Sequence, residues 1–150
     1  MAIALSALAC GLPMGCSLFT TASGPAARWQ KYYDAGKAAY QDERYTEAQR
    51  MFAAAVAEAE TFGDQDERLG RSLNNLAAAY TVQGRYNEAE PLYRRSLAIL
   101  EKSRGPTHPD LVICLENYAA LLRETHRPAE AAKLEQRARA IEAGTADRGP

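Results

Sequence analysis

The stretch Gly84-Arg85-Tyr86-Asn87-Glu88-Ala89 decides how this chain folds, because the sequence contains it three times in recognisable form. A near copy, Glu43-Arg44-Tyr45-Thr46-Glu47-Ala48, lies upstream, and a worn copy, His126-Arg127-Pro128-Ala129-Glu130-Ala131, lies downstream. The final alanines are 41 residues apart (89 − 48) and then 42 (131 − 89). Self-similarity at a fixed period of about 20–50 residues indicates a stacked repeat array. Such arrays bury a core between neighbouring units and leave an extended face free for partners.

The apolar residues within each repeat have helical spacing. In the middle repeat they recur at i, i+3, i+4 and i+7, at Leu73, Leu76, Ala77 and Tyr80, which is one face of an α-helix. Gly84 ends this helix, and a second one follows until the Gly-Pro pair at 105–106. The first and third units have matching stripes, and no stretch has the alternating pattern of a strand. The sequence therefore predicts an all-α chain of six helices.

Segments 73–80, 84–93, 97–102 and 105–110 resemble the tetratricopeptide repeat, in the long-period form of kinesin light chains and many bacterial proteins. The usual period is about 34 residues, so each unit gains roughly two helical turns, which leaves the buried faces in register. The resemblance spans about residues 29–143 and implies a right-handed superhelical array of three helix-turn-helix units. The third unit departs from the pattern: Glu135 stands where Phe52 and Tyr93 stand, and His126 replaces Gly84. A polar outer face suits a terminal cap.

Small residues mark where the two helices of each hairpin should meet. We expect close contact at Ala48, Ala89 and Ala131, since a larger side chain would force the helices apart. Tyr80 and Tyr93 should supply bulk between neighbouring units. Residues 144–150 are predicted to be a disordered tail.

Residues 1–16 are predicted to be a signal segment with a lipidation site. No Lys, Arg, Asp or Glu precedes Arg28, and residues 2–12 form an apolar run too short to span a membrane. Leu12 to Ser17 resembles a bacterial lipoprotein signal in which Cys16 becomes the lipidated first residue. Pro13 and the missing basic segment depart from that pattern, and a misassigned start codon would explain the second departure.

The N-terminal segment leaves alternatives open. The two alternatives to lipidation at Cys16 are processing at Cys10 and an apolar tail without processing, and residues 17–28 are predicted to be a flexible linker. Ser17 after Cys16 resembles the sorting signal of outer membrane lipoproteins. The expected location is therefore the bacterial cell envelope, as an outer membrane lipoprotein facing the periplasm. A cytoplasmic adaptor is the alternative if the true start lies elsewhere.

Composition limits the classes of function. The 150 residues carry a net charge of −1, with Lys and Arg interleaved with acids, so no basic patch predicts nucleic-acid binding. Contact with a membrane is expected through the lipid anchor only. Cys114 is the one cysteine of the predicted domain, which argues against a disulfide scaffold or a metal site, and no cofactor is expected.

A catalytic set of His108, Asp110 and Cys114, with His126 nearby in sequence, can also be considered. A nucleophilic cysteine needs a base within reach of its thiol and a third group that orients the base. Asp110 instead falls at a helix start, and Cys114 lies in an apolar run where a buried thiol is expected. The sequence therefore favours a protein that is not an enzyme.

The resemblance implies that the first helix of each unit lines a concave groove. Asn75 and Asn117 share one register, 42 residues apart (117 − 75), and Asp34 occupies it in the first unit. In the resembled family, Asn at this position bonds the backbone of a bound peptide; alternatively, each amide bridges neighbouring helices. The predicted peptide-binding residues are Tyr33, Lys37, Asn74, Asn75, Asn117 and Arg123.

The function that follows is noncatalytic binding of a partner protein. The groove would hold a peptide segment or a helix of that partner. The alternative is a structural subunit packed permanently in an envelope complex.

Overall fold

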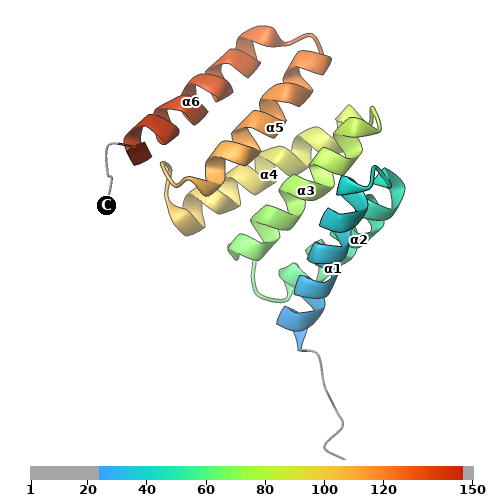
Figure 1. The fold of residues 1–150 in the computed structure, drawn as a ribbon. Coiled ribbons are helices and arrows are strands. Elements are labelled where there is room, and N and C mark those ends of the chain that lie inside the picture. The colour runs from blue at the N-terminus through green and yellow to red at the C-terminus, as the bar shows by residue number, and fades with distance from the viewer. Residues whose placement is uncertain (1–23, 147–150) are drawn as a thin grey trace, which may run out of the picture.

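The computed structural model describes residues 24–146, which form six helices and, within that range, no strand. The helices are α1 (Pro25–Gln41), α2 (Tyr45–Glu60), α3 (Glu67–Val82), α4 (Tyr86–Arg104), α5 (Asp110–Glu124) and α6 (Pro128–Ala146). Consecutive helices pair into three antiparallel hairpins stacked along one direction (Figure 1). The predicted all-α array of three helical repeats is therefore confirmed.

Two helix boundaries differ from the predicted ones. α1 begins at Pro25, inside the predicted linker 17–28, because proline suits the first helical position and Arg28 pairs with Glu58 of α2 at 2.7 Å. α6 continues to Ala146, beyond the predicted boundary at 143. The predicted signal segment with Cys10 and Cys16, the linker up to residue 23 and the end of the tail lie outside the described residues.

The hairpins close on the predicted small residues. Ala48, Ala89 and Ala131 each have 0% exposure, so the helices of every unit meet at these three positions. The large side chains that fill the space between units, Phe52 and Tyr93, are also buried. The predicted contact register of the hairpins is thus confirmed, and it fixes which helix face is left for other contacts.

The turn inside each hairpin needs a left-handed residue at one repeated position. Gly84 has φ of 72°, and the corresponding Glu43 and His126 have φ of 60° and 58°. Glycine adopts this conformation without steric cost, whereas a side chain makes it strained. The repeat therefore keeps the backbone conformation even where it has lost the glycine.

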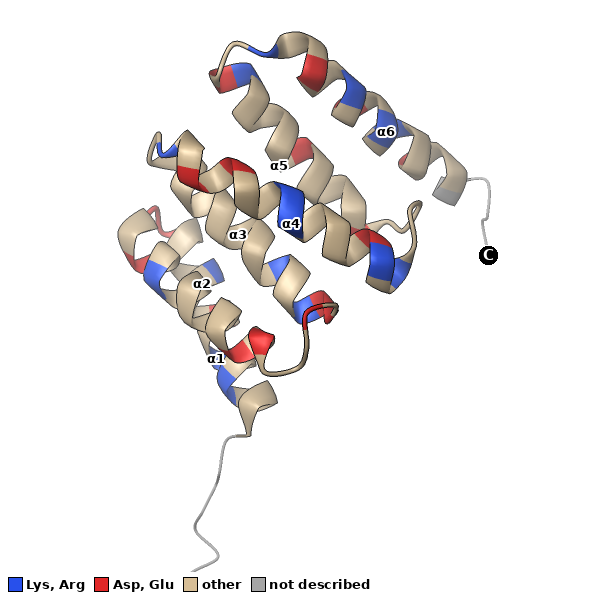
Figure 2. Cartoon of the chain, turned by 180° about the vertical axis from the view of Figure 1, so that it is seen from behind, with Lys and Arg blue, Asp and Glu red and all other residues tan. Residues whose placement is uncertain are grey.

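Charged residues of both signs are interspersed over the helices, as the view from behind shows (Figure 2). Several of them join consecutive hairpins, for example Arg95 with Glu60 at 3.2 Å and Arg127 with Glu90 at 2.9 Å. Between residues 24 and 146, no helix combines the length and the apolar character needed to cross a membrane.

Candidate partner-binding groove

The first helices of the three hairpins, α1, α3 and α5, lie on the same face of the array (Figure 1). Two adjoining hollows open on this face. The larger has a volume of about 350 Å³ and is lined by Tyr33, Lys37, Tyr40, Gln41, Phe52, Asn75, Ala78, Ile113 and Asn117. Nearly all of these residues come from α1, α3 and α5, so the surface exists only when three hairpins stack.

The second hollow has a volume of about 320 Å³ and continues toward the start of α5. Its lining residues are Tyr33, Arg71, Asn74, Asn75, Leu100, Asp110, Ile113 and Cys114. Tyr33, Asn75 and Ile113 line both hollows, which makes them parts of one continuous surface. We call the two hollows together the groove.

Side-chain amides connect the three helices along the floor of the groove. Asn117 of α5 donates from Nδ2 to Asn74 Oδ1 at 3.2 Å, and Asn74 donates from Nδ2 to Asn75 Oδ1 at 3.2 Å. The Asn75 side chain also interacts with the hydroxyl of Tyr33 on α1 and lowers the pKa of that hydroxyl. We call Tyr33, Asn75, Asn74 and Asn117 the amide ladder. Asn117 therefore bridges α5 and α3, as the alternative interpretation of these amides predicted.

The members of the amide ladder differ in exposure. Asn74 is 6% exposed, whereas Asn75 and Asn117 are half-buried and line the larger hollow. Asn74 thus lines the second hollow but shows little of its side chain there, whereas Asn75 and Asn117 face the larger hollow more openly. Sequence alone could not separate the two neighbours, because adjacent helical residues differ by about 100° and the hairpin packing decides which one faces outward.

Tyr33 is held by aromatic contacts at the α1 side of the groove. Its ring stacks on Trp29 at a centroid distance of 4.9 Å and meets the edge of Phe52 at 6.2 Å. Burial raises the pKa of Tyr33, and the interaction with Asn75 offsets part of that rise, so the hydroxyl stays neutral. One turn further, the ammonium of Lys37 lies 5.9 Å from the Tyr33 ring centroid.

Arg123 does not line the groove. It lies in a separate hollow between α5 and α6, with Glu116, Ala120, Glu135, Ala138 and Arg139. Its guanidinium makes a bidentate ion pair with Glu135, at 2.7 and 2.8 Å. The structure therefore brings five of the six predicted peptide-binding residues together and places the sixth elsewhere.

Ile113 is a groove residue that the sequence reasoning missed. It is 61% exposed, an unusual state for a large aliphatic side chain, and it forms the wall shared by both hollows. A signal was present in the sequence: residues 111–115 are all apolar, and one helix cannot bury five consecutive residues on a single face.

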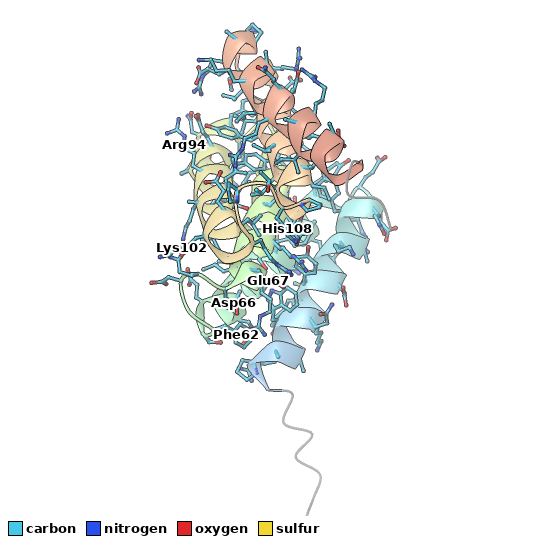
Figure 3. All side chains as sticks on the ribbon, turned by 90° about the vertical axis from the view of Figure 1, so that its left-hand side faces the viewer. Phe62, Asp66, Glu67, Arg94, Lys102 and His108 are labelled. Atoms are coloured by element: carbon cyan, nitrogen blue, oxygen red, sulfur yellow. The ribbon has the colours of Figure 1, made fainter. Side chains whose placement is uncertain are left out.

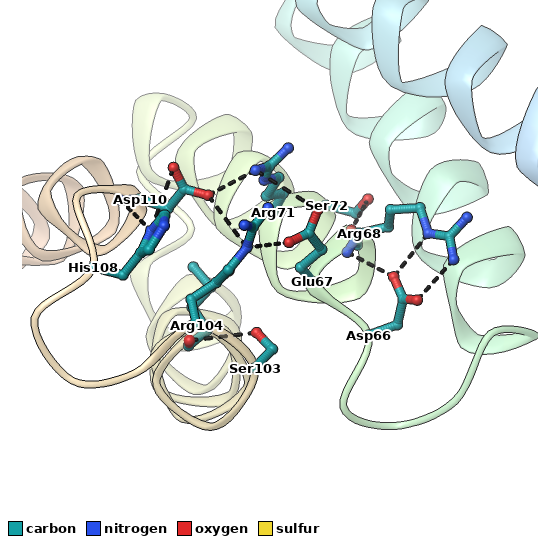
Figure 4. A network of polar contacts seen from close by, with 10 residues as sticks. Asp66, Glu67, Arg68, Arg71, Ser72, Ser103, Arg104, His108 and Asp110 are labelled. Atoms are coloured by element: carbon teal, nitrogen blue, oxygen red, sulfur yellow. Dashed lines mark hydrogen bonds and ion pairs between the residues drawn. The ribbon is translucent and has the colours of Figure 1, made fainter.

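A network of charges closes one end of the groove (Figure 4). Arg71 of α3 pairs with Asp110 of α5 at 2.6 Å, and Arg104 of α4 pairs with Glu67 and lies 3.9 Å from Asp110. Glu67 at the start of α3 and His108 in the turn before α5 are labelled in Figure 3. Burial raises the pKa of Asp110, but its bonds and charge contacts with the two arginines and His108 outweigh burial and hold that pKa below its ordinary value.

The residues considered for nucleophilic chemistry do not form a triad. Cys114 is buried, and its thiol faces Ser96 Oγ at 3.4 Å on α4. Burial raises the pKa of Cys114 to about 12, so the thiol stays protonated. His108 Nδ1 instead accepts a hydrogen bond from the backbone N–H of Asp110 at 3.1 Å. Among the described residues, no cluster of three or more His, Cys, Asp or Glu could hold a metal ion.

The family model of the tetratricopeptide repeat matches residues 30–102 and again residues 69–141. The chain belongs to the tetratricopeptide repeat family. This chain is 32% identical over 85 residues to one relative, Protein KINESIN LIGHT CHAIN-RELATED 2 of Arabidopsis thaliana. That match covers 56% of this chain but 13% of the relative.

Solved structures share the fold. The TPR domain of Arabidopsis FLU has a TM-score of 0.71 at 18% identity and covers 80% of this chain, which covers 98% of that domain. A putative kinesin light chain of Podosopora anserina, with nearly identical TPR-like repeats, has a TM-score of 0.71 at 25% identity. The match covers 81% of this chain and 57% of the Podosopora anserina chain. This is the fold of a protein-interaction scaffold, and the resemblance to the long-period repeats of kinesin light chains is confirmed.

Proposed function

We propose that this chain is a noncatalytic adaptor whose groove holds an extended segment of a partner protein. The half-buried amides of Asn75 and Asn117, set beside the exposed Ile113, carry the proposal. Side-chain amides offer both donors and acceptors, which match a peptide main chain. An extended segment presents free N–H and C=O groups, whereas a helix uses its own internally. The extended segment is therefore the better occupant.

The amide ladder leaves hydrogen-bonding capacity for such a segment. Within residues 24–146, Asn117 uses one N–H toward Asn74, and its Oδ1 accepts no hydrogen bond from another described residue. Ile113 adds an apolar contact beside these polar groups. The combination of a few placed polar groups with an apolar wall is what ligand-binding clefts commonly provide.

The test uses a peptide selected against the wild-type protein from a random display library. We expect Asn117→Ala to weaken its binding by roughly 5- to 150-fold, because a lost bond and an unpaired partner group cost about 1–3 kcal/mol. Ile113→Ser should also weaken it, through the lost apolar contact. Glu88→Gln, at an exposed site on α4, is the matched control and should bind as the wild type does.

Calorimetric titration measures these affinities, and thermal melts report whether each variant folds. Unchanged affinity in both groove variants would contradict the proposal. A lower melting temperature with intact binding would instead assign Asn117 to the scaffold alone.

We further propose that the protein is anchored in the bacterial envelope by a lipid on Cys16, facing the periplasm. The charge-free apolar run that ends at residues 15–17 supports this proposal. Metabolic labelling with a fatty-acid analogue, with Cys16→Ser as the control, tests it. Equal labelling of the two proteins, or none in either, would rule out lipidation at Cys16.

A further inference from the structure

We infer that Asn74 is a positioning residue, which acts by fixing the groove amides of two hairpins. The inference rests on the proposed function of the groove. Asn74 is 6% exposed, and both of its side-chain hydrogen bonds go to groove residues: it accepts from Asn117 of α5 and donates to Asn75 of α3. A buried amide placed between two half-buried ones orients both of them.

The orientation of Asn117 depends on this contact. Within the described residues, the Asn117 side chain makes one hydrogen bond, which goes to Asn74 at 3.2 Å. Asn75 has a second partner in Tyr33, which is itself stacked on Trp29. Loss of Asn74 should therefore free the side chain of Asn117 to rotate, while Asn75 keeps part of its restraint.

The amide ladder also links hairpins whose first helices otherwise contact each other little. Most contact between consecutive hairpins is made by α2 with α3 and by α4 with α5. The bond between Asn117 and Asn74 spans α5 and α3 directly, across the groove floor. Asn74 thus sets the relative placement of polar groups that come from two repeats, which neither repeat could fix alone.

Side chains that are already fixed in the free protein lose less conformational entropy when the peptide binds. Immobilising a side chain that is free to rotate weakens binding by roughly 2- to 12-fold. Because Asn75 keeps part of its restraint, we expect Asn74→Leu to weaken binding of the selected peptide by roughly 2- to 12-fold, through the freed side chain of Asn117. Leucine keeps the branched shape of asparagine, and the half-buried amides that it leaves can bond water, so the fold should survive.

Two measurements test the inference. In the first, side-chain amide signals in 15N spectra report whether the Asn117 amide is ordered in the free protein. Asn74→Leu should sharpen and shift the Asn117 signal toward that of an exposed asparagine. An unchanged Asn117 signal would overturn the inference, whether or not any peptide binds.

In the second measurement, a double-mutant cycle measures peptide affinity for Asn74→Leu, Asn117→Ala and the double variant. If Asn74 acts through Asn117, its replacement should weaken binding less in the Asn117→Ala background than in the wild type. Equal weakening in both backgrounds would overturn the positioning role.

The two proposals can fail separately. If Asn117→Ala weakens binding but Asn74→Leu does not, the groove function stands and the positioning role is wrong. If no selected peptide responds to the groove variants, the proposed function fails, and the amide spectra alone decide the inference.

Discussion

Replacing Gly36 with alanine should destabilise the protein, although alanine is the better helix former. Gly36 lies inside α1 against the ring of Phe52 on α2. A Cβ at this position would lie 2.6 Å from two ring carbons, whereas carbon atoms prefer about 3.5–4.0 Å. The ring would have to move by about 1 Å, and it is 2% exposed with Tyr33 beside it.

The magnitude follows from two opposing contributions. Overpacking a dense core costs about 1–3 kcal/mol. Replacing glycine by alanine within a helix stabilises by about 1 kcal/mol, so we expect a net loss of up to about 2 kcal/mol. Gly144 of α6 provides the matched control, because a Cβ there would meet nothing within 4 Å. The difference between the two variants therefore isolates the overlap, at about 1–3 kcal/mol.

Urea unfolding of the two variants measures this difference as a change in the free energy of unfolding. A second background gives an internal check: in Phe52→Leu the smaller side chain should remove most of the penalty of Gly36→Ala. The reasoning would be refuted if Gly36→Ala were as stable as Gly144→Ala, or if its penalty were the same with leucine at position 52.

Three further predictions concern packing, backbone and charge. Ala89→Leu should lower the free energy of unfolding by about 1–3 kcal/mol, because the site is 0% exposed. The control Glu88→Gln should lower it by about 0.5 kcal/mol or less. Equal melting temperatures of the two variants would contradict the helix contact at Ala89. His126→Gly should stabilise by about 0.5–1 kcal/mol, since φ of 58° strains a side chain, and a lower melting temperature would argue against that strain. Because its neighbours hold the pKa of Asp110 below the ordinary value, the stability that its charge confers should be complete above about pH 5 and lost as the pH falls below about 4. The stability difference between wild type and Asp110→Asn at pH 7 should therefore shrink toward pH 3 in urea titrations, and an undiminished difference would exclude this charge effect.

The fold could be predicted from the sequence because the same local features recur in each repeat. Helical spacing of apolar residues, a turn after each first helix and an alanine at each closest approach all agree, and Ala48 and Ala89 are buried as expected. The start and the end of the array are harder to predict from the sequence. α1 extends back to Pro25 through a proline and an ion pair of Arg28, neither of which adds to the apolar pattern.

The groove could be predicted only in part, because its details depend on contacts between hairpins. The repeat register identifies Asn75 and Asn117, but the bond between Asn117 and Asn74 follows from the distance between α3 and α5. That distance is set by packing, which no single repeat encodes. The exposure of Ile113 is likewise a result of which face of α5 meets α4.

Arg123 illustrates how a departure from the repeat pattern changes the site. In the first two hairpins the position of Glu135 holds Phe52 or Tyr93, which the following hairpin covers; Tyr93, for example, stacks on Tyr118 at 5.7 Å. Within the described residues no further hairpin follows α6, so a carboxylate can occupy this position and keep part of its surface in water. Glu135 then binds Arg123 in a bidentate ion pair, which holds the guanidinium between α5 and α6. Arg123 therefore lies in the hollow between α5 and α6, where the polar residue of the last hairpin supplies its partner.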